Sequence, residues 1–201
     1  MCIMKHLLIT IVLLFGGFLP LRAQNADYTP FRNPKYAHLY QVDTIAVDGI
    51  SYERIEDKRE TGPLIFFLSN TANHLGDEAY RLKDGSRPPK KEESYDHGKV
   101  DMTAMRRAIR SAFTAEENRI LGEEKARIGM YLVFDVDTGA VLEVNFINHA
   151  TPTLISLPLS KFATLEKNIK QYVTTKITDP DTLQLQFVST FIMLKFPLED
   201  Y

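Results

Sequence analysis

Two runs of alternating apolar and polar residues, joined by a glycine turn, set the tightest limit on how this chain of 201 residues folds. Apolar residues take every second position from Met130 to Val136 and again from Leu142 to Phe146, with Asp-Thr-Gly at 137–139 between the runs. Successive side chains of a strand point to opposite faces of a sheet, so each run matches a strand with one apolar face. The pattern predicts an antiparallel β-hairpin, the clearest in the chain.

An earlier segment predicts a second hairpin. Residues 44–47 and 50–55 are rich in β-branched and aromatic residues, and Asp48-Gly49 separates them. An Asp-Gly pair suits a tight hairpin turn, since both turn positions need positive φ. Residues 64–68 follow as a short apolar run, which we interpret as a buried strand.

Helical periodicity appears twice in the second half of the chain. Asp101 is a candidate cap for a helix whose apolar positions are Met102, Met105, Ile109, Ala112 and Phe113. Thr114 and Glu117 match a capping box, which predicts a short helix to Leu121. A longer amphipathic helix is expected over 162–177, ending at Thr178-Asp179-Pro180. The final strand is expected over 183–196, with a bulge near Ser189 where the apolar positions change face.

Together these elements predict an α+β fold, in which a small antiparallel sheet packs against two amphipathic helices and carries an N-terminal β-hairpin extension. We expect residues 24–100 to form this β-rich extension with a long loop, and 101–201 to form a helix-hairpin-helix-strand subdomain. The loop, from about 77 to 98, is expected to be the most mobile internal segment. One shared core is expected to contain Phe134, Phe146, Ile169 and Phe187.

The start of the chain predicts export. An apolar run at 7–15 is followed by Gly16, Gly17 and Pro20, and the run is shorter than a bilayer-spanning helix requires. We expect residues 1–23 to be a signal peptide cleaved after Ala23, although Arg22 leaves a retained anchor as the alternative. No second apolar run of spanning length follows, so no membrane span is expected after processing.

Composition narrows the functional classes. Cys2 is the only cysteine and lies within the predicted signal peptide, so disulfides and thiol chemistry are not expected in the processed chain. Removal of Lys5 and Arg22 with that segment changes the formal net charge from −2 to −4. This mildly acidic charge argues against a nucleic-acid binder, which normally shows a basic face or stripe, so no nucleic acid is expected as a partner.

Three groups of residues are candidate sites. Asp137-Thr138-Gly139-Ala140 matches the nucleophile turn of retroviral-type aspartic proteases, but those enzymes need a later glycine and none follows Gly139; a hairpin turn accounts for the motif. Arg106, Arg107 and Arg110 share one helix side and fit either an anion site or a solvated face. Possible metal ligands gather in the long loop: His74, Asp77, Glu78, Asp96 and His97.

The spacing of these loop residues does not match a zinc motif, and polar loop residues are the better interpretation. The sequence also lacks a G-x-S-x-G elbow, a phosphate-binding loop and a dinucleotide fingerprint. We therefore expect no catalytic residues, no metal and no cofactor.

Residues 129–144, Gly-Met-Tyr-Leu-Val-Phe-Asp-Val-Asp-Thr-Gly-Ala-Val-Leu-Glu-Val, resemble the hairpin of the TonB C-terminal domain. The order helix, hairpin, helix, strand from about 100 to 197 is similar to that family as well. This resemblance implies an exposed sheet edge that accepts an extended peptide. The chain is also similar to uncharacterised secreted families of gut-type bacterial envelopes.

From these observations we expect a non-enzymatic exported protein of the periplasm or cell envelope that binds a protein partner, through an exposed sheet edge. Two alternatives stay open at this point. One is a small-ligand or lipid-binding envelope protein that uses apolar residues beneath the long loop. The other is an uncharacterised hydrolase built on the loop histidines.

Overall fold

A six-stranded antiparallel sheet forms the centre of the protein, as seen in a computed structural model that describes residues 37–57, 65–75, 80–91 and 94–198. The predicted signal peptide lies outside the described residues, as do Asp77 and Glu78. The strands, in the order in which they lie across the sheet, are β1 (Tyr40–Val47), β2 (Ile50–Asp57), β3 (Ile65–Asn70), β6 (Val141–His149), β5 (Arg127–Asp135) and β8 (Phe187–Lys195).

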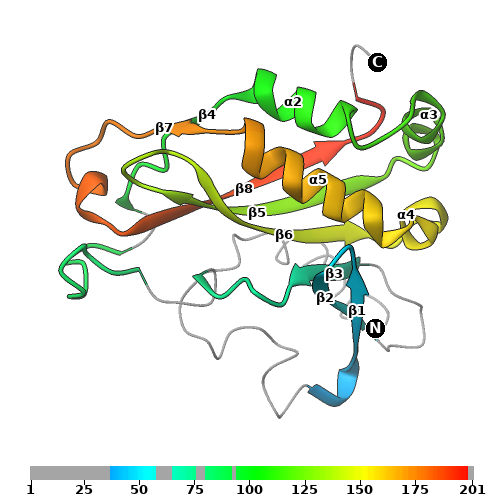
Figure 1. The fold of residues 1–201 in the computed structure, drawn as a ribbon, viewed down its shortest axis with the longest axis horizontal. Helices are drawn as coiled ribbons and strands as arrows, with labels where there is room; N and C mark the ends of the chain where they lie inside the picture. Colours follow the sequence, from blue (N-terminus) through cyan, green and yellow to red (C-terminus); the bar gives the residue numbers. More distant parts are fainter. Residues whose placement is uncertain (1–36, 58–64, 76–79, 92–93, 199–201) are drawn as a thin grey trace, which may run out of the picture.

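Two helices cover one face of this sheet. α2 and α5 lie side by side above β5, β6 and β8, and α5 also contacts β1, whose lower part extends away from the helices (Figure 1). The predicted α+β class, with an antiparallel sheet packed against two amphipathic helices, is confirmed. The helices are α2 (Met102–Arg110), α3 (Ala115–Glu123), α4 (Pro152–Ser156) and α5 (Leu159–Tyr172), and a small second sheet pairs β4 (Lys99–Val100) with β7 (Thr175–Lys176).

Both predicted hairpins form. Val47 pairs with Ile50 across the Asp48-Gly49 turn, where φ is 50° and 80°. β5 and β6 form the second hairpin, with a register shift between Val133 and Phe134. β3 pairs with β6, so the hairpin of the predicted extension belongs to the same sheet as the second hairpin. The boundary predicted at residue 100 stays a prediction, although strands on both sides of it share one sheet.

The helix starts follow the local signals. The Asp101 side chain accepts hydrogen bonds from the N–H groups of Thr103 and Ala104, which caps α2. Thr114 and Glu117 form the predicted capping box at the start of α3. Side-chain caps of this kind satisfy N–H groups that have no partner inside the helix, and so fix where a helix begins.

The predicted end of the second amphipathic helix is wrong. α5 ends at Tyr172, and Val173 already has an extended backbone with ψ of 131°. Thr175 and Lys176 then pair with β4. The apolar period of the sequence continues to 177, but this strand pairing takes the backbone out of the helix before the Asp179-Pro180 stop is reached.

The predicted bulge near Ser189 is also wrong. β8 begins at Phe187 and pairs with β5 without a register shift as far as Lys195. The apolar positions change because both sheet faces are covered at this end. Val188 is buried on the same face as Phe134, whereas the Phe187 ring meets Tyr80 on the opposite face, with ring centroids 5.6 Å apart.

The core prediction is confirmed, because all four expected residues belong to one buried cluster. Phe162 of α5 joins the helix to the sheet, with its ring against Phe146 and Phe66 at edge-on angles of 67° and 82°. The long loop contributes to the core as well. Tyr80 and Tyr95 are 6 % and 5 % exposed, so the described part of the loop is anchored by two aromatic side chains.

Candidate functional site

The outer strand β1 is exposed along most of its length. Residues 41–46 are all exposed, including two large apolar side chains, Val42 at 48 % and Ile45 at 37 %. These two residues lie on opposite faces of the strand because their numbers differ by an odd step. β1 is therefore an edge strand with solvent on both faces.

The hairpin geometry shows which backbone groups face outward. Val47 and Ile50 flank a two-residue turn, so they form a hydrogen-bonded pair, and the pairing then alternates along the hairpin. Val42, Thr44 and Ala46 consequently direct their N–H and C=O groups away from β2. Within the described part of the chain these groups have no hydrogen-bond partner. β1 also carries only one charged side chain, Asp43, and no proline.

The opposite edge of the sheet is better protected. The Ser189 N–H donates to the Tyr80 hydroxyl at 2.6 Å, and the Gln186 N–H donates to the carbonyl of Arg81 at 3.0 Å. The His97 ring also contacts the Ser189 backbone by a hydrogen bond. These contacts cover the start of β8, and Pro197 follows its end. Proteins commonly block edge strands in such ways to prevent unwanted pairing.

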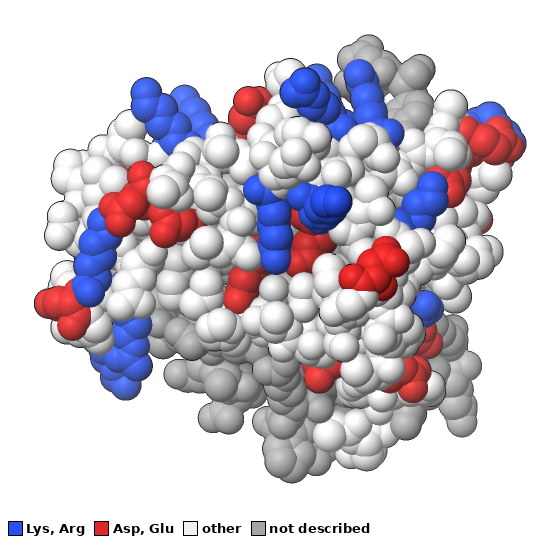
Figure 2. Space-filling model, viewed as in Figure 1, with Lys and Arg blue, Asp and Glu red and all other residues white. Residues whose placement is uncertain are grey.

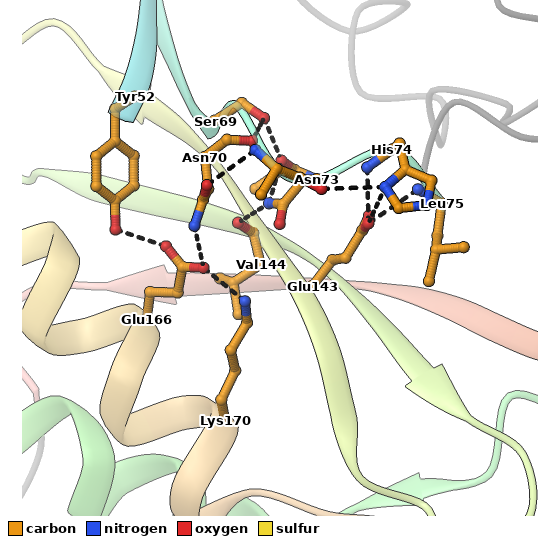
Figure 3. A network of polar contacts seen from close by, with 12 residues as sticks. Tyr52, Ser69, Asn70, Asn73, His74, Leu75, Glu143, Val144, Glu166 and Lys170 are labelled. Atoms are coloured by element: carbon orange, nitrogen blue, oxygen red, sulfur yellow. Dashed lines mark hydrogen bonds and ion pairs between the residues drawn. The ribbon is translucent and has the colours of Figure 1, made fainter. Parts of the chain in front are cut away.

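A buried carboxylate joins the β1–β3 end of the sheet to α5 (Figure 3). Glu166 of α5 is 3 % exposed and accepts hydrogen bonds from the Tyr52 hydroxyl at 2.6 Å, Asn70 Nδ2 at 3.1 Å and Lys170 Nζ at 2.7 Å. Burial raises the pKa of Tyr52 far above its usual value, and the neighbouring Glu166 raises that pKa further. Tyr52 therefore acts as a neutral donor. This network fixes β2 and β3 to the helix.

A second buried carboxylate holds the loop that follows β3. Glu143 of β6 is 4 % exposed, and its Oε1 accepts the backbone N–H groups of His74 at 2.7 Å and Leu75 at 2.9 Å (Figure 3). Beside it, Asn73 Nδ2 donates to the carbonyl of Val144 at 2.9 Å. Both carboxylates thus already receive several hydrogen bonds from the protein itself, which suits a role in the scaffold.

The loop histidines lie against different strands. His74 is held beside Glu143 of β6, and its Nδ1 lies 3.0 Å from the carbonyl of Ala72. His97 contacts Ser189 of β8, and β5 separates β6 from β8 in the sheet. Burial lowers the pKa of His97, against the opposing effect of Asp96. In the described ranges, no three His, Cys, Asp or Glu side chains gather closely enough to hold a metal ion.

The other candidate residues occupy exposed positions. Asp137 lies in the hairpin turn with 65 % of its side chain exposed and forms an ion pair with Lys83. The hydroxyl and N–H of Thr138 donate to Asp135, both at 2.7 Å, and these hydrogen bonds lower the pKa of Asp135. Residues 137–139 therefore form a hairpin turn that is held by its own hydrogen bonds, as the sequence predicted.

The three arginines of α2 are exposed, and the Arg107 guanidinium lies over the Tyr172 ring at 5.6 Å. Over the face seen in Figure 2, basic and acidic side chains are interspersed. Such a mixture is typical of a solvated surface, whereas an anion site would gather positive charge.

Sequence reasoning missed the two buried carboxylates. Glu143 alternates with apolar neighbours in its strand and reads as a solvent-facing residue, and Glu166 precedes Lys170 by four residues, as in an ordinary surface pair. It also missed Asn148, which is fully buried and whose amide atoms have no hydrogen-bond partner in the described structure. Burial of these groups depends on strands that are distant in the sequence.

Comparison with known proteins gives a fold and no more. No family model matches the chain, and no curated protein matches it. The chain is similar to the crystal structure of a DUF5043 family protein from Bacteroides uniformis ATCC 8492, with a TM-score of 0.63, 22 % sequence identity, and coverage of 81 % of this chain and 89 % of that one. The feature that the two proteins share is therefore the architecture of the sheet and helices.

Among the helices of the described segments, none has the length and apolar character needed to cross a membrane.

Proposed function

We propose that this protein is a non-enzymatic, exported protein of the cell envelope that binds a protein partner by accepting an added strand at β1. The observation that supports this function is the open outer edge of β1, where Val42, Thr44 and Ala46 present backbone groups to solvent. Strand addition uses such groups for affinity and the alternating side chains for specificity.

The contrast between the two sheet edges favours β1 as the binding edge. β8 is covered at its start by Tyr80 and Arg81, whereas six successive residues of β1 are exposed. An open edge that is retained in a stable protein needs either a protective device or a partner. β1 carries only one charged residue, Asp43, as protection. The weak protection of this edge favours a partner that covers it.

The experiment is capture of partners from envelope extracts with the tagged exported protein. Thr44→Pro removes one outward N–H and leaves the pairing with β2 intact, because proline is tolerated where an edge N–H faces solvent. Thr44→Ala is the matched control, since it shortens the same side chain but keeps the N–H. We expect the protein captured by the wild type and by Thr44→Ala to be lost with Thr44→Pro. Equal capture by all three would refute binding at this edge.

Export is tested separately on the same material. The terminus of the exported protein, measured by mass spectrometry, is expected at or near Gln24. Retention of Met1 would instead support the anchored alternative.

A further inference from the structure

We propose that the occupant of the β1 edge is a second copy of this chain, paired antiparallel about a two-fold axis at Thr44. This inference rests on the proposed function, because it names the partner of the same edge. Closed two-fold symmetry is the commonest arrangement of soluble homo-oligomers, and it makes residue i of one copy face residue j of the other and the reverse.

The outward backbone groups restrict the register of such a dimer. A two-fold axis perpendicular to the sheet keeps each side chain on its own face, so a residue can lie opposite only residues of the same parity. With the axis at Thr44, Thr44 of one copy faces Thr44 of the second copy, and Val42 of each copy faces Ala46 of the other. Each of these pairs exchanges both N–H···O bonds, giving about six hydrogen bonds across the interface.

Charge excludes the neighbouring register at Asp43, and an axis at Ile45 leaves only Thr44 and Ala46 to exchange hydrogen bonds, because Val42 then faces the turn residue Asp48. With Asp43 on the axis, two carboxylates would lie directly opposite each other, which destabilises a sheet. With Thr44 on the axis, Asp43 faces Ile45 of the second copy and no like charges are opposed. An axis at Val42 avoids the carboxylate pair too, but leaves Ile45 to Val47 beyond the paired region.

The side chains of the even-numbered residues of β1, which share one face of the strand, fit the same register. Thr44 against Thr44 is flanked on both sides by Val42 against Ala46, so this row contains only small or β-branched residues. Val42, which is 48 % exposed in the single chain, gains neighbours on the second copy. The sheet then continues through both copies, and the open edge disappears.

The first test is the mass of the exported wild-type protein at micromolar concentration, measured by sedimentation. We expect a dimer for the wild type and for Thr44→Ala, and a monomer for Thr44→Pro. Thr44→Lys keeps the N–H but places two ammonium groups at the axis, so it is expected to be monomeric as well. Thr44→Lys decides the outcome if circular dichroism shows that Thr44→Pro does not fold. A dimer that survives Thr44→Lys would overturn the proposal.

Cysteine cross-linking tests the register. In a Cys2→Ser background, Thr44→Cys places two thiols opposite each other at a Cα separation of about 5.5 Å, within the range of a disulfide. Val42→Cys places them four residues out of register, and it is the matched control. Oxidation is expected to link Thr44→Cys and to leave Val42→Cys unlinked. The reverse pattern, or no link in either, would overturn the proposal.

Failure of this inference is distinguishable from failure of the proposed function. A monomeric wild type whose captured partner is lost with Thr44→Pro overturns the second copy but retains strand addition by another protein. A monomeric wild type whose capture is unaffected by Thr44→Pro refutes both. A dimer with the Thr44→Cys link supports both.

Discussion

Glu166 shows how a charged residue becomes part of a core. Its side chain is 3 % exposed, yet it lies on a helix packed against phenylalanine rings. Burial of a carboxylate costs several kcal/mol unless hydrogen bonds and an opposite charge compensate. Tyr52, Asn70 and Lys170 supply both, and two of these three residues come from β2 and β3. The residue therefore links the N-terminal strands to the helical layer.

The first prediction concerns the Tyr52 hydroxyl. Tyr52→Phe keeps the buried ring but removes the 2.6 Å hydrogen bond to Glu166, so one acceptor of a buried carboxylate loses its donor. Hydrogen bonds to charged groups contribute about 1.5–3 kcal/mol, and we expect the free energy of unfolding in urea to fall by that amount. Tyr172→Phe is the control, because Tyr172 is 39 % exposed, and it should change little. Similar losses in both variants would contradict the role assigned to Glu166.

At the scale of elements, two glycines separate backbone conformation from packing. Gly49 and Gly139 both lie in hairpin turns with positive φ, at 80° and 68°. A Cβ on Gly49 would meet open space, whereas one on Gly139 would lie 2.0 Å from the carbonyl oxygen of Thr175. The Gly139 carbonyl also accepts the Thr175 N–H at 2.9 Å, so this turn is docked onto β7.

The second prediction follows from that difference. Gly49→Ala is expected to destabilise the protein by about 1 kcal/mol, the conformational cost alone. Gly139→Ala should cost that amount plus about 1–3 kcal/mol for overpacking against a backbone that cannot easily move. Urea denaturation of the two variants measures both values. Equal losses would show that the turn is not held against β7.

Elements determined by local chemistry were predictable from the sequence. The Asp48-Gly49 turn and the Thr114 capping box each depend on residues within four positions, and both form as expected. The end of α5 and the straight course of β8 depend on distant partners: β4 pairs with β7, and Tyr80 covers Phe187 from a loop about a hundred residues earlier. Periodicity carries no information on such partners.

The same limit applies to the candidate site. The Asp48-Gly49 signal predicted β1 as a strand, but not that it lies at the edge. Its edge position follows from the pairing of β3 with β6, whose residues are some eighty positions apart. The resemblance to the TonB domain implied an exposed edge, without indicating which strand provides it.

At the scale of the whole molecule, the six-stranded sheet is the surface on which helices α2 and α5 pack. α2 and α5 cover β5, β6 and β8, and α5 contacts β1, whose lower part extends away from the helices (Figure 1). Two histidines lie at separate places on this sheet, His97 against β8 and His149 at the end of β6. Both histidines belong to the same sheet structure, and a small domain normally unfolds in one cooperative step, so we expect their protonation to act on global stability.

The last prediction is the pH dependence of that stability. Burial lowers the pKa of His97, and burial together with Arg127 lowers the pKa of His149. The unfolded chain, with histidine pKa values of about 6.5, then binds protons that the folded chain resists. Stability is therefore complete above about pH 7.5 and decreases as pH falls through 6.5 towards the lower folded values.

Urea denaturation at pH 7.5 and 5.5 measures this loss, a window in which the carboxylates with lowered pKa values remain ionised. His97→Gln should reduce the difference between the two pH values, and the double variant with His149→Gln should reduce it further. The same variants compared at pH 7.5 and 8.5 provide the control, because both histidines are neutral there and the slope should match that of the wild type. An undiminished loss in the double variant would assign the pH dependence to other groups.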